Sequence, residues 1–260
     1  MIALAQKRPS FALAALMAVV KIVISVMVVA LIWQGLIVWF GIPHYIVPRP
    51  LAIAVGFHDN ASTLWRQTLV TLTSSALGLA ISTTLAIAIA IAFTLQKRVA
   101  QASLPIVIVF RSAPIAAVAP IIMLFLGRGL ATSIAVVIIV SFFPLLINLM
   151  RGLHAADPNA RELLHVYGAS RWQQIQYVRI PYAMPYLFTG LRVAGASAIL
   201  GAMLSEWITG SRGLGNLILE SGEMRQTALL WCAVLTAVAI SLIVFATTSA
   251  GERRVLHWRR

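Results

Sequence analysis

The sequence predicts an all-α membrane protein with about six transmembrane helices. Hydrophobic residues make up 60% of the 260 residues, charged residues only 10%, and the mean hydropathy is +0.93. Soluble domains of this length are not so apolar. The polar residues fall between apolar runs of about 20 residues, which is the length that a helix needs to cross a bilayer. We therefore expect one membrane domain over residues 1–260 and no sizeable soluble domain.

The apolar runs, taken in order, give the predicted spans. The run after Lys7 and Arg8 is too long for a cleaved signal peptide, so we read it as a first span that stays in the protein. Residues 41–66 form a polar connection that contains prolines. Small residues in the second and fifth spans predict close helix contacts. The spans cover about residues 18–40, 68–95, 102–126, 130–150, 183–205 and 228–250.

The basic residues predict the orientation of these spans. The side that holds both termini would carry twelve: Lys7, Arg8, Lys97, Arg98, Arg151, Arg161, Arg171, Arg179, Arg253, Arg254, Arg259 and Arg260. The other side would carry five: Arg49, Arg66, Arg128, Arg212 and Arg225. Because cytoplasmic loops are enriched in Lys and Arg, we expect both termini in the cytoplasm. The net charge of +13 follows from the same bias, and the spread of the basic residues argues against nucleic-acid binding.

Residues 151–181, which we call the central hairpin, are polar and lie between the fourth and fifth predicted spans. Asp157 can cap a helix that begins at Pro158. Gly168 stands where a helix stop needs a positive φ. Ser170 and Gln173 have the spacing of a capping box for a second short helix, and Pro181 would limit its extension. Ala160, Leu163, Leu164 and Tyr167 would form one apolar face of the first helix.

The central hairpin resembles the cytoplasmic "EAA" loop of the permease subunits of ABC importers. That pattern runs Glu-Ala-Ala, three residues, Gly, nine residues, Ile-x-Leu-Pro. Here Glu162, Gly168 and Pro181 match it, and Leu163 and Leu164 replace the two alanines. The resemblance extends over about residues 40–250 and implies a type I importer permease of the sulfonate, nitrate and taurine branch. The alternative is a surface hairpin that has no partner.

The resemblance also implies the assembly. We expect a second permease subunit, as a homodimer, with two cytoplasmic ATPase subunits and an extracytoplasmic substrate-binding protein in a bacterial inner membrane. ATP and Mg would bind to the partner ATPase, so no cofactor and no catalytic residue is expected on this chain. Glu162 would accept a bond from an ATPase arginine, or else lie on a solvated helix face. The expected coupling residues are Asp157, Ala160, Arg161, Glu162, Leu163, Leu164, Tyr167, Gly168, Ala169, Ser170, Trp172 and Pro181.

A second set of residues is expected along the translocation pathway or at its gate. A charge at membrane depth, such as Arg111 or Arg192, either contacts an anionic solute or holds the fold, and for Arg192 the structural role is favoured. Prolines in the third span would break its helix. The glycines after Glu206 allow a tight loop that lines an outer gate or only caps the surface. The set comprises Arg111, Pro114, Pro120, Arg192, Glu206, Gly213 and Gly215.

The residue types exclude several other chemistries. The single cysteine, Cys232, cannot form an internal disulfide, and the histidines have no metal-ligand spacing. The sequence contains no phosphate-binding Gly-x-x-x-x-Gly-Lys-Ser/Thr loop, so nucleotide hydrolysis is expected on another chain. The alternative to an ATP-driven importer is a secondary transporter, which would predict carboxylates deep in the spans. An intramembrane enzyme would need a nucleophile and base, and the sequence offers no such pair.

Overall fold

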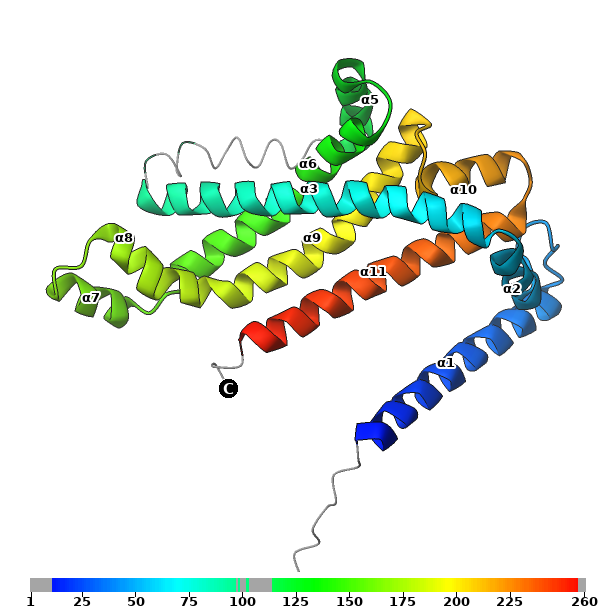
Figure 1. Cartoon of the computed structure of the whole chain (residues 1–260), viewed down its shortest axis with the longest axis horizontal. Helices are drawn as coiled ribbons and strands as arrows, with labels where there is room; N and C mark the ends of the chain where they lie inside the picture. Colours follow the sequence, from blue (N-terminus) through cyan, green and yellow to red (C-terminus); the bar gives the residue numbers. More distant parts are fainter. Residues whose placement is uncertain (1–10, 97, 99–101, 103–113, 257–260) are drawn as a thin grey trace, which may run out of the picture.

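The computed structural model describes residues 11–96, 98, 102 and 114–256, and these residues form an elongated bundle of helices (Figure 1). No strand occurs among them. In chain order the elements are α1 (Phe11–Phe40), α2 (Pro50–Asp59), α3 (Ala61–Leu95), α5 (Ile115–Leu126), α6 (Leu130–His154), α7 (Pro158–Val166), α8 (Arg171–Gln174), the π-helical turn η1 (Ile175–Arg179), α9 (Ile180–Thr209), α10 (Leu214–Glu223) and α11 (Thr227–Val255).

The centre of the bundle is the packing of α3, α6 and α9, which small residues allow to lie close together. On α3 the buried positions include Ser74, Ser75 and Gly78, and a Cβ on Gly78 would meet the side chain of Val137 on α6 at 2.5 Å. Alanines at positions 194, 198 and 202 form a buried stripe on α9. Backbones that approach closely gain dispersion contacts in lipid, where the hydrophobic effect does not drive association.

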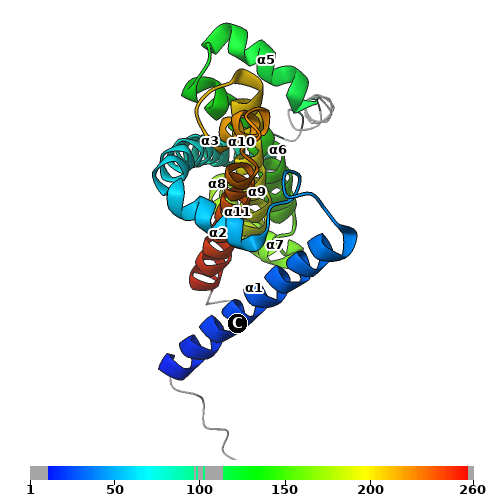
Figure 2. The same cartoon turned by 90° about the vertical axis from the view of Figure 1, so that its right-hand side faces the viewer.

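The helix α1 stands apart from this centre. Figures 1 and 2 show it leaning away from the bundle and meeting it only near α2. The contact is made by Ile37, which is buried, and by Trp33, whose ring lies edge-on to that of Trp231 with 4.9 Å between centroids. Most of its described side chains are exposed. This surface is apolar enough to face lipid or another subunit.

Five helices among the described residues are long and apolar enough to cross a membrane. They contain the predicted spans 18–40, 68–95, 130–150, 183–205 and 228–250, each within a longer helix. The third predicted span, 102–126, is described only in part, as the shorter apolar helix α5. The count of six spans therefore stays a prediction.

Two short helices were missed by the sequence analysis. Residues 41–66 were read as a polar connection, yet α2 forms there with Pro50 in its first turn. Residues 206–227 likewise contain α10. Both pack against α11, and their buried residues Ile53, Leu214 and Leu217 belong to one core cluster with Leu229 and Cys232. Tertiary contact, which single-sequence periodicity does not reveal, stabilises helices this short.

The prediction that Pro181 limits the second hairpin helix is wrong. The chain stays helical from Arg171 through the π turn to Thr209. Within the π turn the N–H of Ile180 donates to the carbonyl of Ile175, five residues back. The wider π turn directly before Pro181 accommodates the proline, which lies at the start of α9.

The elements divide between two ends of the bundle. The central hairpin and the end of α11 lie toward one end, and α2 and α10 lie at the other (Figure 1). The hairpin and α10 therefore stand at opposite ends of the bundle.

Candidate functional site

The central hairpin consists of α7, a glycine turn and α8. Asp157 accepts a hydrogen bond from the N–H of Asn159 at 2.9 Å, which confirms the predicted cap. Gly168 has φ +74°, and the N–H of Ala169 donates to the carbonyl of Leu164 at 2.9 Å, as in a Schellman stop. The capping box of the next helix is present in both directions: the N–H of Gln173 bonds the hydroxyl of Ser170, and the N–H of Ser170 bonds the Gln173 side chain.

Much of the apolar face of the hairpin is exposed in the described chain. No residue of α7 is buried. Leu163, Tyr167 and Trp172 are 57%, 80% and 52% exposed, while Ala160 and Leu164 are half-buried. Glu162 is also exposed and accepts no hydrogen bond from the described residues. Three large apolar side chains beside a free carboxylate make a surface suited to another protein.

The second half of the hairpin is tied firmly to the bundle. Ile175 and Val178, on the π turn, are buried, and the turn packs against both α6 and α9. Because α8, η1 and α9 form one continuous helix, a force applied to α8 is transmitted to α9 without an intervening loop. Trp172 thus stands on a continuous extension of α9, and the predicted coupling residues of α7 are joined to that extension by the turn at Gly168.

At the opposite end, Glu206 is fully buried and joins three segments. Its Oε2 accepts hydrogen bonds from the hydroxyl of Thr71 on α3, at 2.9 Å, and from the N–H of Gly215, at 3.0 Å. Thr71 accepts in turn from the N–H of Leu214, and Gln67 accepts from the N–H of Gly213. We call these five residues and Glu206 the Glu206 network; it fixes the start of α10 against α3 and α9.

The glycines of this network are required by close packing. Gly213 has φ +141°, and a Cβ there would meet the carboxyl group of Glu206. A Cβ on Gly215 would meet the carbonyl oxygen of Met203, a backbone atom that cannot rotate away. The structure therefore places Glu206, Gly213 and Gly215 together, as the sequence analysis expected for one segment. Their role at a gate stays a prediction, since Glu206 has no exposed surface in this conformation.

A cavity of about 520 Å³ opens beside the Glu206 network. It lies between α3, the turn before α6 and the loop before α10, and we call it the Arg128–Arg212 cavity. Two arginines line it, with hydroxyl groups contributed by Thr73, Ser133 and Ser211. Guanidinium and hydroxyl groups are donors that suit an anion. The sequence analysis did not select these residues, since Arg128 and Arg212 counted only toward the orientation.

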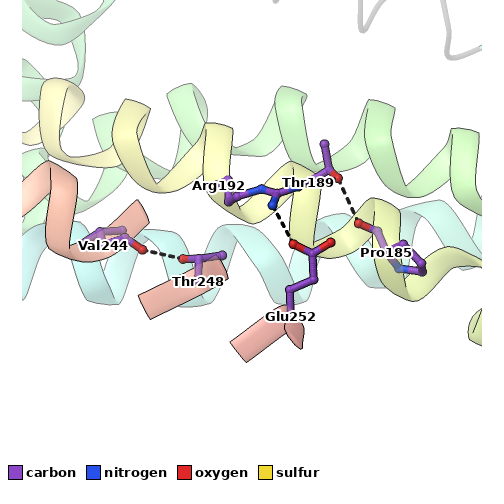
Figure 3. Close-up of polar contacts among 6 residues, drawn as sticks. All are labelled: Pro185, Thr189, Arg192, Val244, Thr248 and Glu252. Atoms are coloured by element: carbon purple, nitrogen blue, oxygen red, sulfur yellow. Dashed lines mark hydrogen bonds and ion pairs between the residues drawn. The ribbon is translucent and has the colours of Figure 1, made fainter. Parts of the chain in front are cut away.

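Arg192 makes an ion pair with Glu252. Its guanidinium lies 2.6 Å from the Glu252 carboxylate and also bonds the hydroxyl of Thr189 (Figure 3). Glu252 projects from the last turn of α11, and the pair joins α9 to α11. This contact supports the structural role of Arg192. The partner was missed because nothing in the sequence shows that the end of α11 lies beside the middle of α9.

The remaining predicted pathway residues belong to the third span. Arg111 lies outside the described residues. Pro114 caps the N-terminus of α5 and does not interrupt it, and Pro120 lies inside that helix. The turn after α5 uses Gly127 and Gly129, both with positive φ.

Comparison with known proteins places the chain among transport proteins. Residues 82–257 match the family described as binding-protein-dependent transport system inner membrane component. The chain is 34% identical to the riboflavin transport system permease protein RibX of Chloroflexus aurantiacus, over 90% of this chain and 88% of that protein. It is 27% identical to the taurine transport system permease protein TauC of Escherichia coli, over 83% of this chain and 78% of that one.

A solved structure has a similar fold. The crystal structure of an amino acid ABC transporter with histidines matches with a TM-score of 0.65 at 17% identity, and the match covers 77% of this chain and 97% of that chain. At this identity the likeness concerns the arrangement of helices alone.

Proposed function

Because the chain belongs to the family of binding-protein-dependent transport system inner membrane components, we propose that its two ends do different work in an ATP-driven importer. The chain is a permease subunit of the ABC importer class, and it works with an ATPase and a substrate-binding protein. The ATPase binds at the end of the bundle that holds the central hairpin. A small solute enters at the end that holds α10. The observation that carries this proposal is the exposed face of α7, which a short glycine turn joins to the helix that runs from α8 into α9.

The mechanism follows from that continuity. ATP draws two ATPase subunits together, each holding one hairpin through Leu163, Tyr167 and Glu162. The hairpin moves with α9, and the pathway between two copies of the permease opens outward; hydrolysis resets it. ATP binding must favour the outward-open state by a few kcal/mol for this cycle to turn over. The proposed assembly contains two copies of this chain, two ATPases and one binding protein. Both termini of each permease lie in the cytoplasm.

The proposed solute is a small anion of the sulfonate, taurine or nitrate type. The Arg128–Arg212 cavity supports this class, since none of the acidic residues in the chain lines it. A heteroaromatic solute is the second candidate, and the similarity to the riboflavin permease RibX favours it. Either solute would be delivered by the binding protein.

The coupling role is tested at Gly168. Gly168→Val places a β-branched residue at a positive φ, which strains the turn and tilts α7. Gly41→Val is the matched control, since Gly41 also has positive φ and open space but lies outside the hairpin. We expect ATP-driven uptake into proteoliposomes and ATPase copurification to fall at least tenfold for Gly168→Val alone. Equal uptake by the two variants would reject the coupling role.

The solute class is tested with the purified binding protein and reconstituted importer. Calorimetry should show binding of a sulfonate, taurine or nitrate and no binding of riboflavin. Arg212→Gln should then raise the KM for the anion in uptake, while Arg49→Gln, a basic residue outside the cavity, should leave it unchanged. Tight binding of riboflavin would replace the first candidate with the second.

A further inference from the structure

A second cavity lies at the hairpin end of the bundle, where no role has been assigned. Its volume is about 660 Å³, and the end of α3, α8 and the π turn line it. Three arginines contribute to it: Arg98 from beyond α3, Arg171 from the start of α8 and Arg179 from the π turn. Leu95 and Ile175 supply apolar walls. We call it the arginine pocket.

The positive charge of the arginine pocket is unbalanced within this chain. All seven acidic residues of the sequence lie in the described ranges, and none lines the pocket. None of the three arginines forms an ion pair among the described residues. The charge of Arg161 acts on Arg179 as well and adds to the repulsion. Like charges held together without a counter-ion raise the free energy, so an anion that enters this pocket is bound favourably.

The depth of the pocket limits which anion can reach it. The apolar helix α3 ends at Leu95, and the charged residues of the pocket on this segment follow with Arg98. That boundary is where the hydrocarbon core of a bilayer gives way to headgroups. The pocket therefore combines three cationic side chains with two apolar ones at the end of an apolar helix. Arginine forms paired hydrogen bonds with the oxygens of a phosphate.

We propose that the arginine pocket binds the phosphate headgroup of an anionic phospholipid from the same leaflet as the central hairpin. One phosphate oxygen pair faces Arg171 and Arg179, and Arg98 closes the outer side. Basic pockets between transmembrane helices on the cytoplasmic side are typical sites for such headgroups. A lipid held there fills the space between α3 and α8 and braces the hairpin against the bundle.

The test uses the purified complex of the permease with its ATPase. Phosphatidylglycerol, phosphatidylcholine or inorganic phosphate is titrated into the delipidated complex. Native mass spectrometry counts the lipids retained, and thermal unfolding follows stability. Variants are Arg171→Gln/Arg179→Gln and the single Arg98→Gln, an exposed position that tolerates change. Arg253→Gln, exposed at the same end and outside the pocket, is the matched control.

We expect phosphatidylglycerol to be retained and to raise the unfolding temperature, with phosphatidylcholine much weaker. Affinity for phosphatidylglycerol should fall about fivefold for each arginine removed and stay unchanged in Arg253→Gln. If the double variant does not fold, the affinity of Arg98→Gln for phosphatidylglycerol is compared with that of Arg253→Gln instead.

Three outcomes would overturn the proposal. Inorganic phosphate that stabilises the complex when phosphatidylglycerol does not would identify a soluble anion as the ligand. Equal loss of lipid in Arg98→Gln and Arg253→Gln would show a nonspecific charge effect. Release of the ATPase by the pocket variants, with lipid retention unchanged, would identify the pocket as a contact for an acidic protein segment.

Discussion

At the scale of single residues, the Glu206 network shows how a membrane protein uses a buried carboxylate. Burial of a charge is unfavourable unless hydrogen bonds compensate. Here Thr71 and Gly215 both donate to one oxygen of Glu206. Thr71 lies 135 residues before Glu206 and Gly215 only nine after it. The bonds are possible because the glycines allow backbone and carboxyl group to approach. The network is therefore sensitive to any added atom.

Gly215→Ala should destabilise the protein much more than Gly222→Ala. Both glycines lie in α10, but a Cβ at Gly215 meets the Met203 carbonyl, whereas at Gly222 the nearest atom is a Leu230 methyl at 3.4 Å. Overpacking of this kind costs about 1–3 kcal/mol or more. Thermal unfolding in detergent would compare the two variants. Equal unfolding temperatures would contradict the packing described for Gly215.

Arg192 and Glu252 should behave as a structural pair. Their side chains are 28% and 22% exposed, so the bond is partly shielded from water. A double-mutant cycle with Arg192→Gln and Glu252→Gln should give a coupling energy of about 1 kcal/mol in unfolding measurements. The KM for the transported solute should not change in Arg192→Gln. A raised KM without energetic coupling would mean that Arg192 contacts the solute.

At the scale of elements, the hairpin depends on local capping more than on burial. The helix α7 has no buried residue, and its neighbour α8 begins with a complete capping box. Such a short segment keeps its shape because the orphan N–H groups are satisfied by side chains. It can therefore be preformed before a partner binds.

Ser170→Ala should loosen the hairpin, and Ser170→Asp should restore it, since aspartate also caps a helix. Loss of the cap costs about 1 kcal/mol. Hydrogen exchange at residues 171–174 should accelerate about fivefold in Ser170→Ala and return toward the original rate in Ser170→Asp. ATPase retention should follow the same order. Unchanged exchange in Ser170→Ala would show that tertiary contacts, not the cap, hold α8.

At the scale of the whole molecule, the two ends of the bundle should lie on opposite sides of the membrane. Cys232 is the only cysteine, and it is fully buried, so it should not react with polar maleimides. Glu162→Cys, in the hairpin, and Glu220→Cys, in α10, both replace exposed acidic residues. In intact cells without an outer membrane, a membrane-impermeant maleimide should label Glu220→Cys only. Labelling of Glu162→Cys from outside would show that the hairpin faces outward and would contradict the expected orientation.

The sequence by itself determined the features that depend on neighbouring residues. Composition predicted helices in a membrane, and spacing predicted the Asp157 cap, the Gly168 stop and the Ser170 capping box. These features involve atoms within a few residues of one another, so local chemistry suffices. The spans were too short at their ends because helices continue beyond the apolar core into the interface, as α3 does toward residue 61.

Only the tertiary structure decided which distant residues meet. It paired Arg192 with Glu252, buried Glu206 against Thr71, and gathered Arg98, Arg171 and Arg179 around one pocket. It also carried the helix through Pro181, because the wider π turn directly before it accommodates the proline. Such contacts join distant positions, for example Thr71 and Glu206, which are 135 residues apart, and no local pattern in the chain encodes them. They arise when small residues let α3, α6 and α9 pack closely, which fixes the neighbours of every polar side chain between them.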